Sequence, residues 1–343
     1  GKLTPDETFD GMIGFNTQDS MRLYVDGELL IDGWGEKNDA DRTVPFRYEK
    51  GRSYDIAIEF TNDHRGARVV FGFSREKEDF TRALEMAKKA DIAIVFAGDS
   101  QDTCGENLDR VSLDLPGSQK VFVQEVAATG TPVVLVMQTG RPVTCGWEND
   151  NIPAILQAWF PGEQGGRAIA ETLFGDNAPS GRLPISFPRH VGQIPCHYSR
   201  RPGGGMRYVE MDWQPLYPFG YGLSYTEFSY GGLELSSDTI KPGEAIEASF
   251  VVTNTGDREG MAVPQIYLRD MVSSTVKPKL LLAAIDKIPL KPGESRRVTL
   301  MISPKSMRTL DRGFRWHIEP GDFKVFLADS SDHLIMSRDF RVG

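Results

Sequence analysis

Apolar and polar residues alternate along the first 75 residues, which is the pattern of β-strands with one buried face. Asp26-Gly27 lies between two such stretches and predicts a hairpin, because Asp-Gly supplies the positive φ angles of a tight turn. About 75 residues are few for a β-sandwich, so we expect only part of such a domain here. The predicted strands cover residues 11–16, 21–25, 53–60 and 67–73.

The pattern changes near Arg75, where helical spacing and short apolar runs begin to alternate. The run 92–97 is wholly apolar, which indicates a strand buried on both faces of a parallel sheet. Strands that alternate with helices predict right-handed βαβ units. Only three such strands are visible, too few for an independent doubly wound domain. The predicted helices cover 78–90, 118–129 and 166–174, and the other strands cover 133–137 and 155–158.

The last half of the chain begins with a long connection and ends in strands. Residues 175–225 are rich in glycine, proline and aromatic residues, and we expect them to be ordered because disordered linkers are poor in aromatic residues. From Ser229 onward, strands separated by turn signals predict an immunoglobulin-like or fibronectin-like sandwich. The clearest predicted strands cover 246–252, 263–268, 297–301 and 323–327.

Composition narrows the choice of partners. The formal net charge of −9 argues against a nucleic-acid or anionic-membrane partner. No stretch approaches the roughly 20 apolar residues that span a bilayer. Cys104, Cys145 and Cys196 lie far apart without a CxxC pair, which argues against a zinc site or a disulfide framework. The sequence predicts a soluble protein and leaves its compartment open between cytoplasmic and secreted or periplasmic.

The loop after the apolar run 92–97 is the first place to look for chemistry. In open α/β sheets, ligands bind outside the carboxyl ends of the strands. The loop carries four carboxylates, Asp99, Asp102, Glu106 and Asp109. On the residues alone, two interpretations stay open: one of these groups is an acid or base, or all four solvate a surface loop.

Four segments, in order, resemble glycoside hydrolase family 3, the β-glucosidases and their relatives. Residues 104–110 (Cys-Gly-Glu-Asn-Leu-Asp-Arg) and 113–119 resemble the family's acid/base loop and the helix that follows it. Residues 161–166 (Pro-Gly-Glu-Gln-Gly-Gly) and 174–184 are similar to its α/β sandwich domain. Residues 216–226 resemble the segment that leads into its fibronectin type III-like domain. The resemblance covers nearly the whole chain.

The resemblance implies a multidomain chain that combines α/β and all-β folds. It implies the end of a protective-antigen-type β-sandwich insert over 1–75 and an α/β sandwich domain with a mostly parallel sheet over 76–200. A connecting segment is expected over 201–228 and a fibronectin type III-like sandwich over 229–343. The family's nucleophilic aspartate lies on an N-terminal (β/α)8 barrel, which needs about 250 residues and is absent here. We therefore expect the C-terminal part of a larger enzyme, with the barrel on a second chain or a missing part.

The activity implied by the resemblance is that of a retaining β-glycosidase, foremost a β-glucosidase, that removes terminal β-linked sugars from oligosaccharides or glycosides without a cofactor or metal. Glu106 is the expected general acid/base, with Asp102 as the alternative. We expect Gly105 to give this loop backbone freedom. Asp109 and Arg110 are expected to form a local ion pair or cap the turn. A proton donor of this kind must be protonated near neutral pH, which loss of water and a neighbouring carboxylate both favour.

Trp34, just past the predicted hairpin, is a candidate sugar contact. In similar enzymes the inserted domain borders the mouth of the active site, and exposed aromatic rings stack on sugars; packing in the core is the alternative. β-Xylosidase and natural-product glycosidase activities stay open, as does a non-catalytic carbohydrate-binding or scaffolding fragment. The sequence leaves the oligomeric state open and is compatible with a homodimer.

Overall fold

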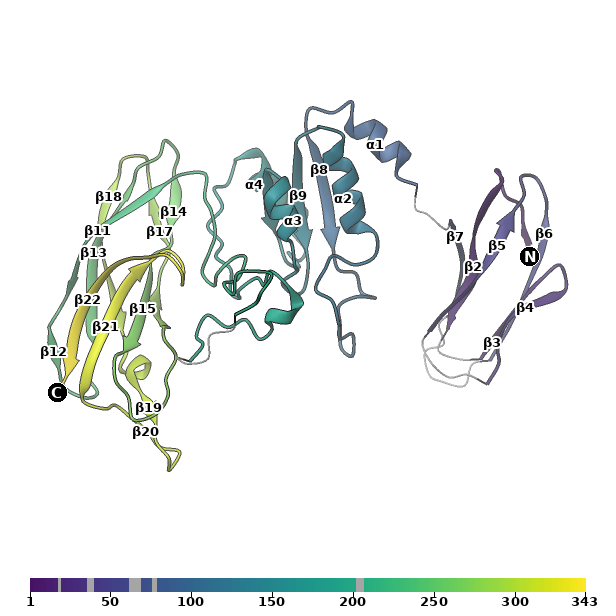
Figure 1. Cartoon of the computed structure of the whole chain (residues 1–343). Coiled ribbons are helices and arrows are strands. Elements are labelled where there is room, and N and C mark those ends of the chain that lie inside the picture. Colours follow the sequence, from purple (N-terminus) through teal and green to yellow (C-terminus); the bar gives the residue numbers. More distant parts are fainter. Residues whose placement is uncertain (18–19, 36–39, 62–68, 76–78, 202–206) are drawn as a thin grey trace. The chain divides into compact units, whose positions relative to one another are not determined.

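The computed structural model describes residues 1–17, 20–35, 40–61, 69–75, 79–201 and 207–343. The chain divides into two compact units, Gly1–Ala90 and Asp91–Gly343 (Figure 1). Among the described residues, no helix combines the length and the hydropathy that a membrane crossing needs.

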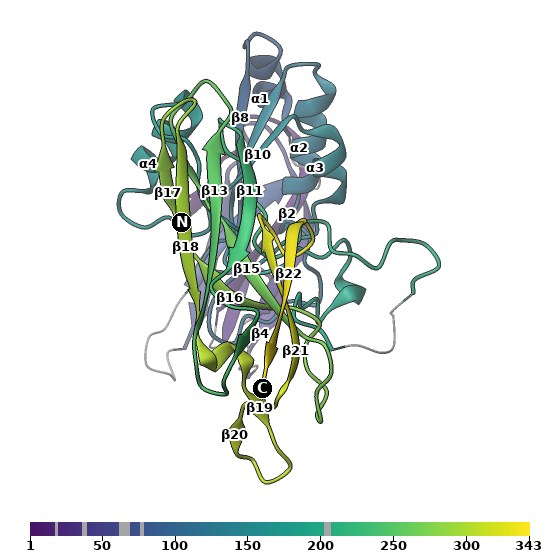
Figure 2. The same cartoon turned by 90° about the vertical axis from the view of Figure 1, so that its left-hand side faces the viewer.

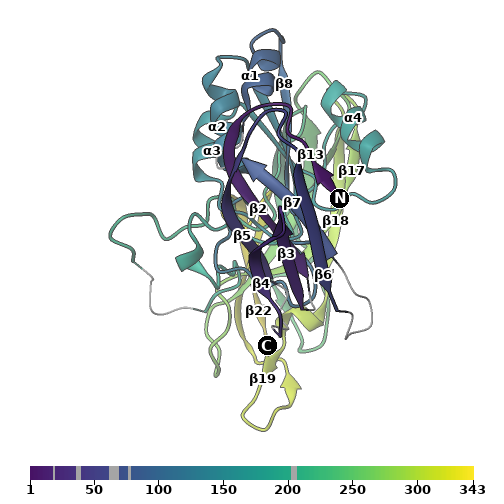
Figure 3. The same ribbon diagram turned by 90° about the vertical axis from the view of Figure 1, so that its right-hand side faces the viewer.

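The first unit is an antiparallel β-sandwich followed by a short helix, α1 (Thr81–Ala87). Its sheets have the strand orders β1-β6-β3-β4 and β5-β2-β7, and Figure 3 looks onto them. Side chains from both sheets form one core, which includes Ile13 of β2, Leu23 of β3 and Tyr48 of β5. The strands are β1 (Lys2–Leu3), β2 (Phe9–Thr17), β3 (Met21–Val25), β4 (Glu28–Gly33), β5 (Ala40–Tyr48), β6 (Tyr54–Phe60) and β7 (Val69–Arg75).

The hairpin predicted at Asp26-Gly27 is confirmed, because β3 pairs antiparallel with β4 and both turn residues have positive φ, 53° and 83°. The strand predicted at 67–73 is β7, and residues 67 and 68 lie outside the described part. Strand β5 escaped prediction because it carries several polar residues and a proline, Pro45, which weakens a strand pattern. The resemblance of this unit to a protective-antigen-type domain stays a prediction.

The second unit begins with the predicted parallel sheet, and its strand order is β10-β9-β8 (Figure 1). The prediction that the run 92–97 is buried on both faces is wrong, because Ile94 and Phe96 are 44% and 55% exposed on one face of β8. Helix α2 packs against β8 and β9, and its buried residues are Val123 and Val126. Strand β8 is thus an edge strand of this sheet, with the candidate loop at its carboxyl end. The elements are β8 (Ala93–Gly98), α2 (Gln119–Ala128), β9 (Val133–Gln138), α3 (Gly146–Asn151), β10 (Ala154–Gln157) and α4 (Gly165–Phe174).

In its described residues, the connection after α4 contains one short 3-10 helix, η1 (Val191–Gln193), and is held by aromatic contacts. Phe187 makes edge contacts with Trp159 and Tyr217, at centroid distances of 5.8 and 6.0 Å. Tyr217 stacks on Tyr221 at 5.4 Å. The prediction that this connection is ordered, and not a disordered linker, is confirmed for its described residues, 175–201 and 207–225.

The C-terminal strands form the predicted sandwich (Figure 2). Sheets β11-β13-β18 and β12-β22-β21-β15-β16 share one core that includes Leu233, Phe250, Ile266 and Phe323. The elements are β11 (Phe228–Leu235), β12 (Thr239–Ile240), β13 (Ile246–Asn254), β14 (Gly260–Ala262), β15 (Gln265–Asp270), β16 (Leu281–Ile285), β17 (Ile288–Leu290), β18 (Ser295–Ile302), η2 (Pro304–Met307), β19 (Thr309–Leu310), β20 (Trp316–His317), β21 (Gly321–Ala328) and β22 (Leu334–Val342).

Glu319 ties two loops of this sandwich together. Its carboxylate accepts hydrogen bonds from the hydroxyl and the amide of Ser274, the hydroxyl of Ser273 and the ring of His317. The bonds from Ser274 are the main reason that the pKa of Glu319 falls from 4.5 to about 2. Because the folded pKa lies below the unfolded one, the ionised carboxylate stabilises the fold above about pH 4.5 and loses this effect as the pH falls towards 2.

We expect Glu319→Gln to lower the free energy of unfolding at pH 7 and to flatten its decline between pH 4.5 and 2. Urea unfolding at several pH values measures both effects. Asp339→Asn is the control, because that carboxylate is exposed and lies at 3.2 Å from the half-buried Lys324. If the free energy of unfolding of Glu319→Gln declined between pH 4.5 and 2 as steeply as that of the parent, the Glu319 carboxylate would not be the source of this pH dependence.

Candidate active site

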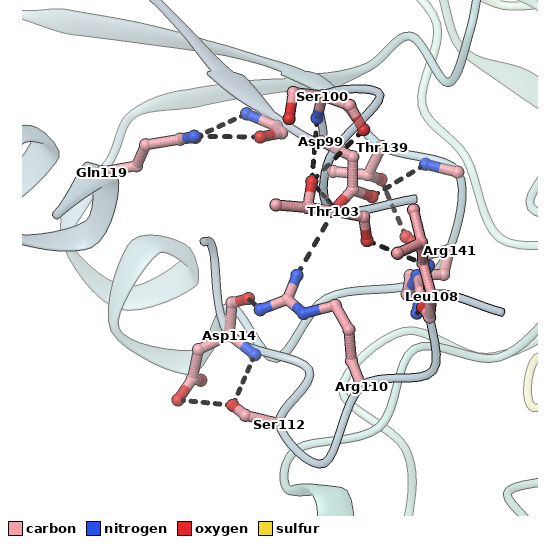
Figure 4. Close-up of polar contacts among 12 residues, drawn as sticks. Asp99, Ser100, Thr103, Leu108, Arg110, Ser112, Asp114, Gln119, Thr139 and Arg141 are labelled. Atoms are coloured by element: carbon pink, nitrogen blue, oxygen red, sulfur yellow. Dashed lines mark hydrogen bonds and ion pairs between the residues drawn. The ribbon is translucent and has the colours of Figure 1, made fainter. Parts of the chain in front are cut away.

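Asp99 organises the loop at the carboxyl end of β8 (Figure 4). Its side chain is fully buried, and Oδ2 accepts the amide of Gly140 at 3.1 Å. Oδ1 accepts the hydroxyl of Thr103 at 3.2 Å and a guanidinium N–H of Arg110 at 3.4 Å. One buried carboxylate therefore joins the start of the loop, its end and the segment after β9.

Two arginines hold the remainder of the loop in place. Arg110 also donates to the carbonyl of Asp114 at 2.7 Å, which anchors the loop's exit. Arg141 donates to the carbonyls of Thr103 and Leu108 at 3.2 and 3.4 Å, so one side chain connects two separate parts of the loop. A hydrogen bond with the Cys104 side chain is the main reason that the pKa of Arg141 is raised, with attraction to nearby carboxylates adding to it. The surroundings of Arg141 therefore favour its cationic form.

Gln119 secures the last residue of β8. Its side-chain Oε1 accepts the amide of Gly98 at 2.6 Å, and its Nε2 donates to the carbonyl of Gly98 at 2.9 Å. This bidentate pair fixes the point at which the strand becomes the loop. Gly98 itself cannot be replaced easily, because a Cβ there would lie 2.0 Å from the carbonyl oxygen of Gln138.

We expect Gln119→Leu to lower the free energy of unfolding by about 1–2 kcal/mol, because it leaves the amide and carbonyl of Gly98 without these partners. Urea unfolding followed by circular dichroism measures the change. Gln124→Leu, on the same helix, is the matched control and should stay within about 0.5 kcal/mol of the parent. Equal effects of the two substitutions would contradict a special role for Gln119.

Glu106 lies at the exposed tip of the loop. It is the second residue of a turn that closes with a hydrogen bond from the amide of Leu108 to the carbonyl of Gly105, at 3.3 Å. Among the described residues, the Glu106 carboxylate forms no hydrogen bond or ion pair. The Glu106 carboxylate is thus accessible to an external group, while the buried network of Asp99, Arg110 and Arg141 holds the loop.

The expected role of Gly105 in backbone freedom stays a prediction. The left-handed residue of this turn is Asn107, with φ 60°, a conformation that asparagine tolerates better than most side chains. Gly105 is instead a position of close approach, where a Cβ would lie 3.2 Å from Cδ1 of Leu108. The strained backbone therefore follows Glu106 rather than preceding it.

Two other loop carboxylates, Asp102 and Asp109, are exposed like Glu106. Arg110 fixes the exit of the loop as predicted, but its ion-pair partner is Asp99 and not Asp109. Past the loop, Asp114 accepts the hydroxyl of Thr144, and this bond is the main reason that its pKa is lowered.

Trp34 directly follows β4 in the first unit and is 44% exposed, so the alternative interpretation of core packing is wrong. The guanidinium of Arg22 lies over its ring at 4.8 Å, and Asp32 accepts both Arg22 Nε and the amide of Trp34 at 3.0 Å. These contacts hold the ring in one orientation. A ring presented in this way can stack on a ligand.

Sequence reasoning missed Asp99, Arg141 and Gln119 as the residues that build the loop. One signal was available: Asp99 directly follows a buried strand, where a carboxylate has backbone amides within reach. Nothing in the sequence pattern distinguishes Arg141 or Gln119, because their partners lie 33 to 38 and 21 residues away along the chain.

Comparison with known proteins gives two family matches. The model of the glycosyl hydrolase family 3 C-terminal domain matches residues 13–225, and the fibronectin type III-like domain matches residues 262–331. A periplasmic beta-glucosidase of Salmonella typhimurium is 42% identical over 260 residues, 73% of this chain and 34% of that protein. A beta-xylosidase of Formosa agariphila is 40% identical over 75% of this chain and 36% of that protein.

The crystal structure of a beta-glucosidase from Kluyveromyces marxianus superimposes on the whole chain and on 44% of its own, with a TM-score of 0.79 and 27% identity. The chain thus spans about a third to less than half of the length of these proteins. The first family model covers well over half of the chain, including the candidate loop. This chain belongs to glycoside hydrolase family 3, of which it contains the C-terminal domain together with a fibronectin type III-like domain.

Proposed function

We propose that this chain supplies the general acid/base of a retaining β-glycosidase, with Glu106 as that group. The observation that carries the proposal is the loop at the carboxyl end of β8. Its exposed carboxylate has no partner among the described residues, and it stands on a network of buried hydrogen bonds. An enzyme needs this combination, since a catalytic group must be available to substrate and still be fixed in space.

The reaction proceeds in two steps with retention of configuration. In the first, an aspartate carboxylate outside this chain attacks the anomeric carbon while Glu106 gives its proton to the departing glycosidic oxygen. In the second, Glu106 takes a proton from water, and the water oxygen displaces the aspartate from the sugar. A bound sugar that excludes water and the charge of the nucleophile both favour the protonated form of Glu106 at the start.

The nucleophile is proposed to lie on a (β/α)8 barrel, carried by another part of the same protein or by a second chain. The greater length of the relatives leaves room for such a domain. A β-glucoside is the first candidate substrate, because relatives and structural neighbours are named beta-glucosidases, and a β-xyloside is the second.

The experiment is to assay aryl β-glucosides and β-xylosides with this chain alone and with the barrel polypeptide added. We expect negligible turnover by the chain alone and restored turnover in the assembly, with the glucoside preferred. Turnover at native rates by the 343-residue chain alone would overturn the proposal. Sugar binding without turnover in the assembly would favour a carbohydrate-binding fragment instead.

Trp34 is proposed as an additional contact to the sugar. The support is its half-exposed ring and the fixed orientation given by Arg22 and Asp32. We expect Trp34→Ala to raise KM for a β-linked disaccharide by about fivefold with little change in kcat, as loss of one stacking contact of about 1 kcal/mol would do. Trp316→Ala, an exposed tryptophan of β20, is the control. Equal KM values in parent and Trp34→Ala would show that Trp34 does not contact the sugar.

A further inference from the structure

The second unit contains a cavity of about 760 Å³ that is separate from the candidate loop. Its walls come from the connection between residues 186 and 218, from the two residues before β16 and from the turn between β21 and β22. The described residues that line it include none of 99–110. Pockets for small molecules usually have volumes of about 300–1,000 Å³, so this cavity is large enough for a ligand of the size of a sugar.

Hydrogen bonds between distant segments hold the walls of this cavity. The buried side chain of Gln193 donates to the three carbonyls of residues 212–214 at 3.1–3.2 Å. The hydroxyl of Tyr198 accepts the amide of Leu282 at 3.3 Å, and its ring stacks on Phe219 at a centroid distance of 4.1 Å. The connection and the C-terminal sandwich thus form the cavity together, as a fixed part of the fold.

The lining of the cavity is positively charged, although the chain as a whole is acidic. Arg200, Arg201 and Lys279 line it, and Asp332 is the one carboxylate among the described lining residues. With His197 neutral, these side chains give a formal charge of +2, whereas the whole chain has −9. None of the three cations forms an ion pair within the described part of the chain. The cavity therefore attracts anions.

Arg200 is the cation that is best prepared to hold a ligand. Its guanidinium carbon lies over the ring of Trp213, 3.8 Å from the centroid, and its backbone carbonyl accepts the amide of Lys279 at 3.0 Å. The stacked ring orients the guanidinium, and within the described structure its N–H groups donate no hydrogen bond. A planar guanidinium with free donors binds a carboxylate through two parallel hydrogen bonds, and one that is already oriented loses little freedom when it does so.

A neighbouring thiol leaves this positive charge uncompensated. Cys196 also lines the cavity, and burial raises the pKa of its thiol, with the charge of Arg200 acting in the opposite direction. A protonated thiol adds no negative charge to the lining.

Much of the remaining wall is apolar or aromatic. Three prolines and three aromatic residues contribute to it, namely Pro195, Tyr198, Tyr208, Trp213, Pro215 and Pro218. Such surfaces contact the C–H faces of a sugar ring, because those faces are apolar while the hydroxyl groups point outward. A ligand that fits this cavity therefore combines an anionic group with a ring that has an apolar face.

We propose that this cavity binds an acidic saccharide, in which a sugar ring carries a carboxylate. Arg200 holds the carboxylate through paired hydrogen bonds, Lys279 adds a second positive charge, and the aromatic and proline wall contacts the ring. A saccharide is the ligand class because the chain belongs to a glycoside hydrolase family. The proposal does not rest on the proposed function, since it needs neither Glu106 nor a barrel.

Titration of the purified chain with glucuronate tests the proposal, with the indole N–H resonance of Trp213 as the readout. The resonance is assigned by its loss in Trp213→Phe. Glucose offers the ring without the carboxylate, and inorganic sulfate offers the charge without the ring. We expect glucuronate to bind at least about tenfold more tightly than either, because each of the others lacks one of the two sets of contacts.

Three outcomes of this titration would overturn the proposal. The first is no binding of glucuronate. The second is equal affinity for glucose, which would show that the carboxylate is not recognised. The third is equal affinity for sulfate, which would show that the cavity takes anions in general and does not recognise a sugar.

Variants of Arg200 add a second readout. Arg200→Gln should weaken glucuronate binding by about tenfold or more and change glucose binding by less than about twofold. Arg200→Lys keeps the charge without the planar donors and should recover only part of the affinity. Arg338→Gln is the control, because Arg338 is exposed on β22 outside the cavity, and it should bind like the parent. Circular dichroism checks that the variants are folded, and equal glucuronate affinity of Arg200→Gln and Arg338→Gln would contradict the proposal.

Discussion

Glu106→Gln in the assembled enzyme is expected to lower kcat by about 10²- to 10⁴-fold on glycosides with poor leaving groups, the usual contribution of a general acid or base. The amide has nearly the same shape as the carboxyl group but cannot give up a proton to the glycosidic oxygen. A substrate whose leaving group departs without protonation, such as a dinitrophenyl glycoside, should lose much less in the first step. The kcat/KM values of a series of aryl glycosides whose leaving phenols decrease in acidity measure this difference, because kcat/KM reports the first step.

Asp102→Asn is the control for this experiment, because Asp102 is exposed on the same loop and is the alternative acid/base. It should retain kcat within about threefold of the parent, as surface substitutions usually do. The reverse pattern, with Asp102→Asn inactive and Glu106→Gln active, would assign the role to Asp102. Similar losses of kcat/KM, which reports the first step, on all leaving groups in Glu106→Gln would indicate a structural effect.

Asp99→Ala is expected to lower the free energy of unfolding of the second unit by about 3 kcal/mol. The substitution leaves the guanidinium of Arg110 without its charged partner in a mostly buried position and leaves the amide of Gly140 without its acceptor. It also removes a side chain that joins the start and end of the loop to the segment after β9 (Figure 4). The loop should therefore become more susceptible to proteolysis than the surrounding sheet.

Urea unfolding and limited proteolysis measure the two effects of Asp99→Ala. Asp109→Ala is the matched control, because it removes an exposed carboxylate from the same loop and should change stability by less than about 0.5 kcal/mol. Equal stability of the two variants would show that burial of Asp99 does not hold the loop. Equal rates of loop cleavage would lead to the same conclusion.

Local chemistry explains which parts of the fold were predictable. Lys-Pro-Gly-Glu occurs at 241–244 and 291–294, and in both copies the glutamate carboxylate accepts the lysine amide while the glycine has positive φ. Proline and glycine at the centre determine such a turn by themselves. The parallel strands β8 and β9 were equally easy to predict, because each is a continuous apolar run.

The site was predictable only in part. Its location followed from the buried strand, and Glu106 followed from the family resemblance. The four loop carboxylates have similar chemistry in the sequence, however, and only the fold makes Asp99 buried and Glu106 exposed. The difference arises from Gly140 and Arg141, which follow β9 and reach the loop only when the two strands are paired. Contacts of this range leave no periodic signal in the chain.

The most direct test of the acid/base assignment is the product that Glu106→Gly forms with azide in the assembled enzyme. Azide needs no base to attack the glycosyl-enzyme, so it should raise the turnover of an activated β-glucoside and yield a β-glucosyl azide after two inversions. Nuclear magnetic resonance of the product gives its configuration. No acceleration by azide, or an α-configured azide, would contradict Glu106 as the acid/base of a retaining enzyme.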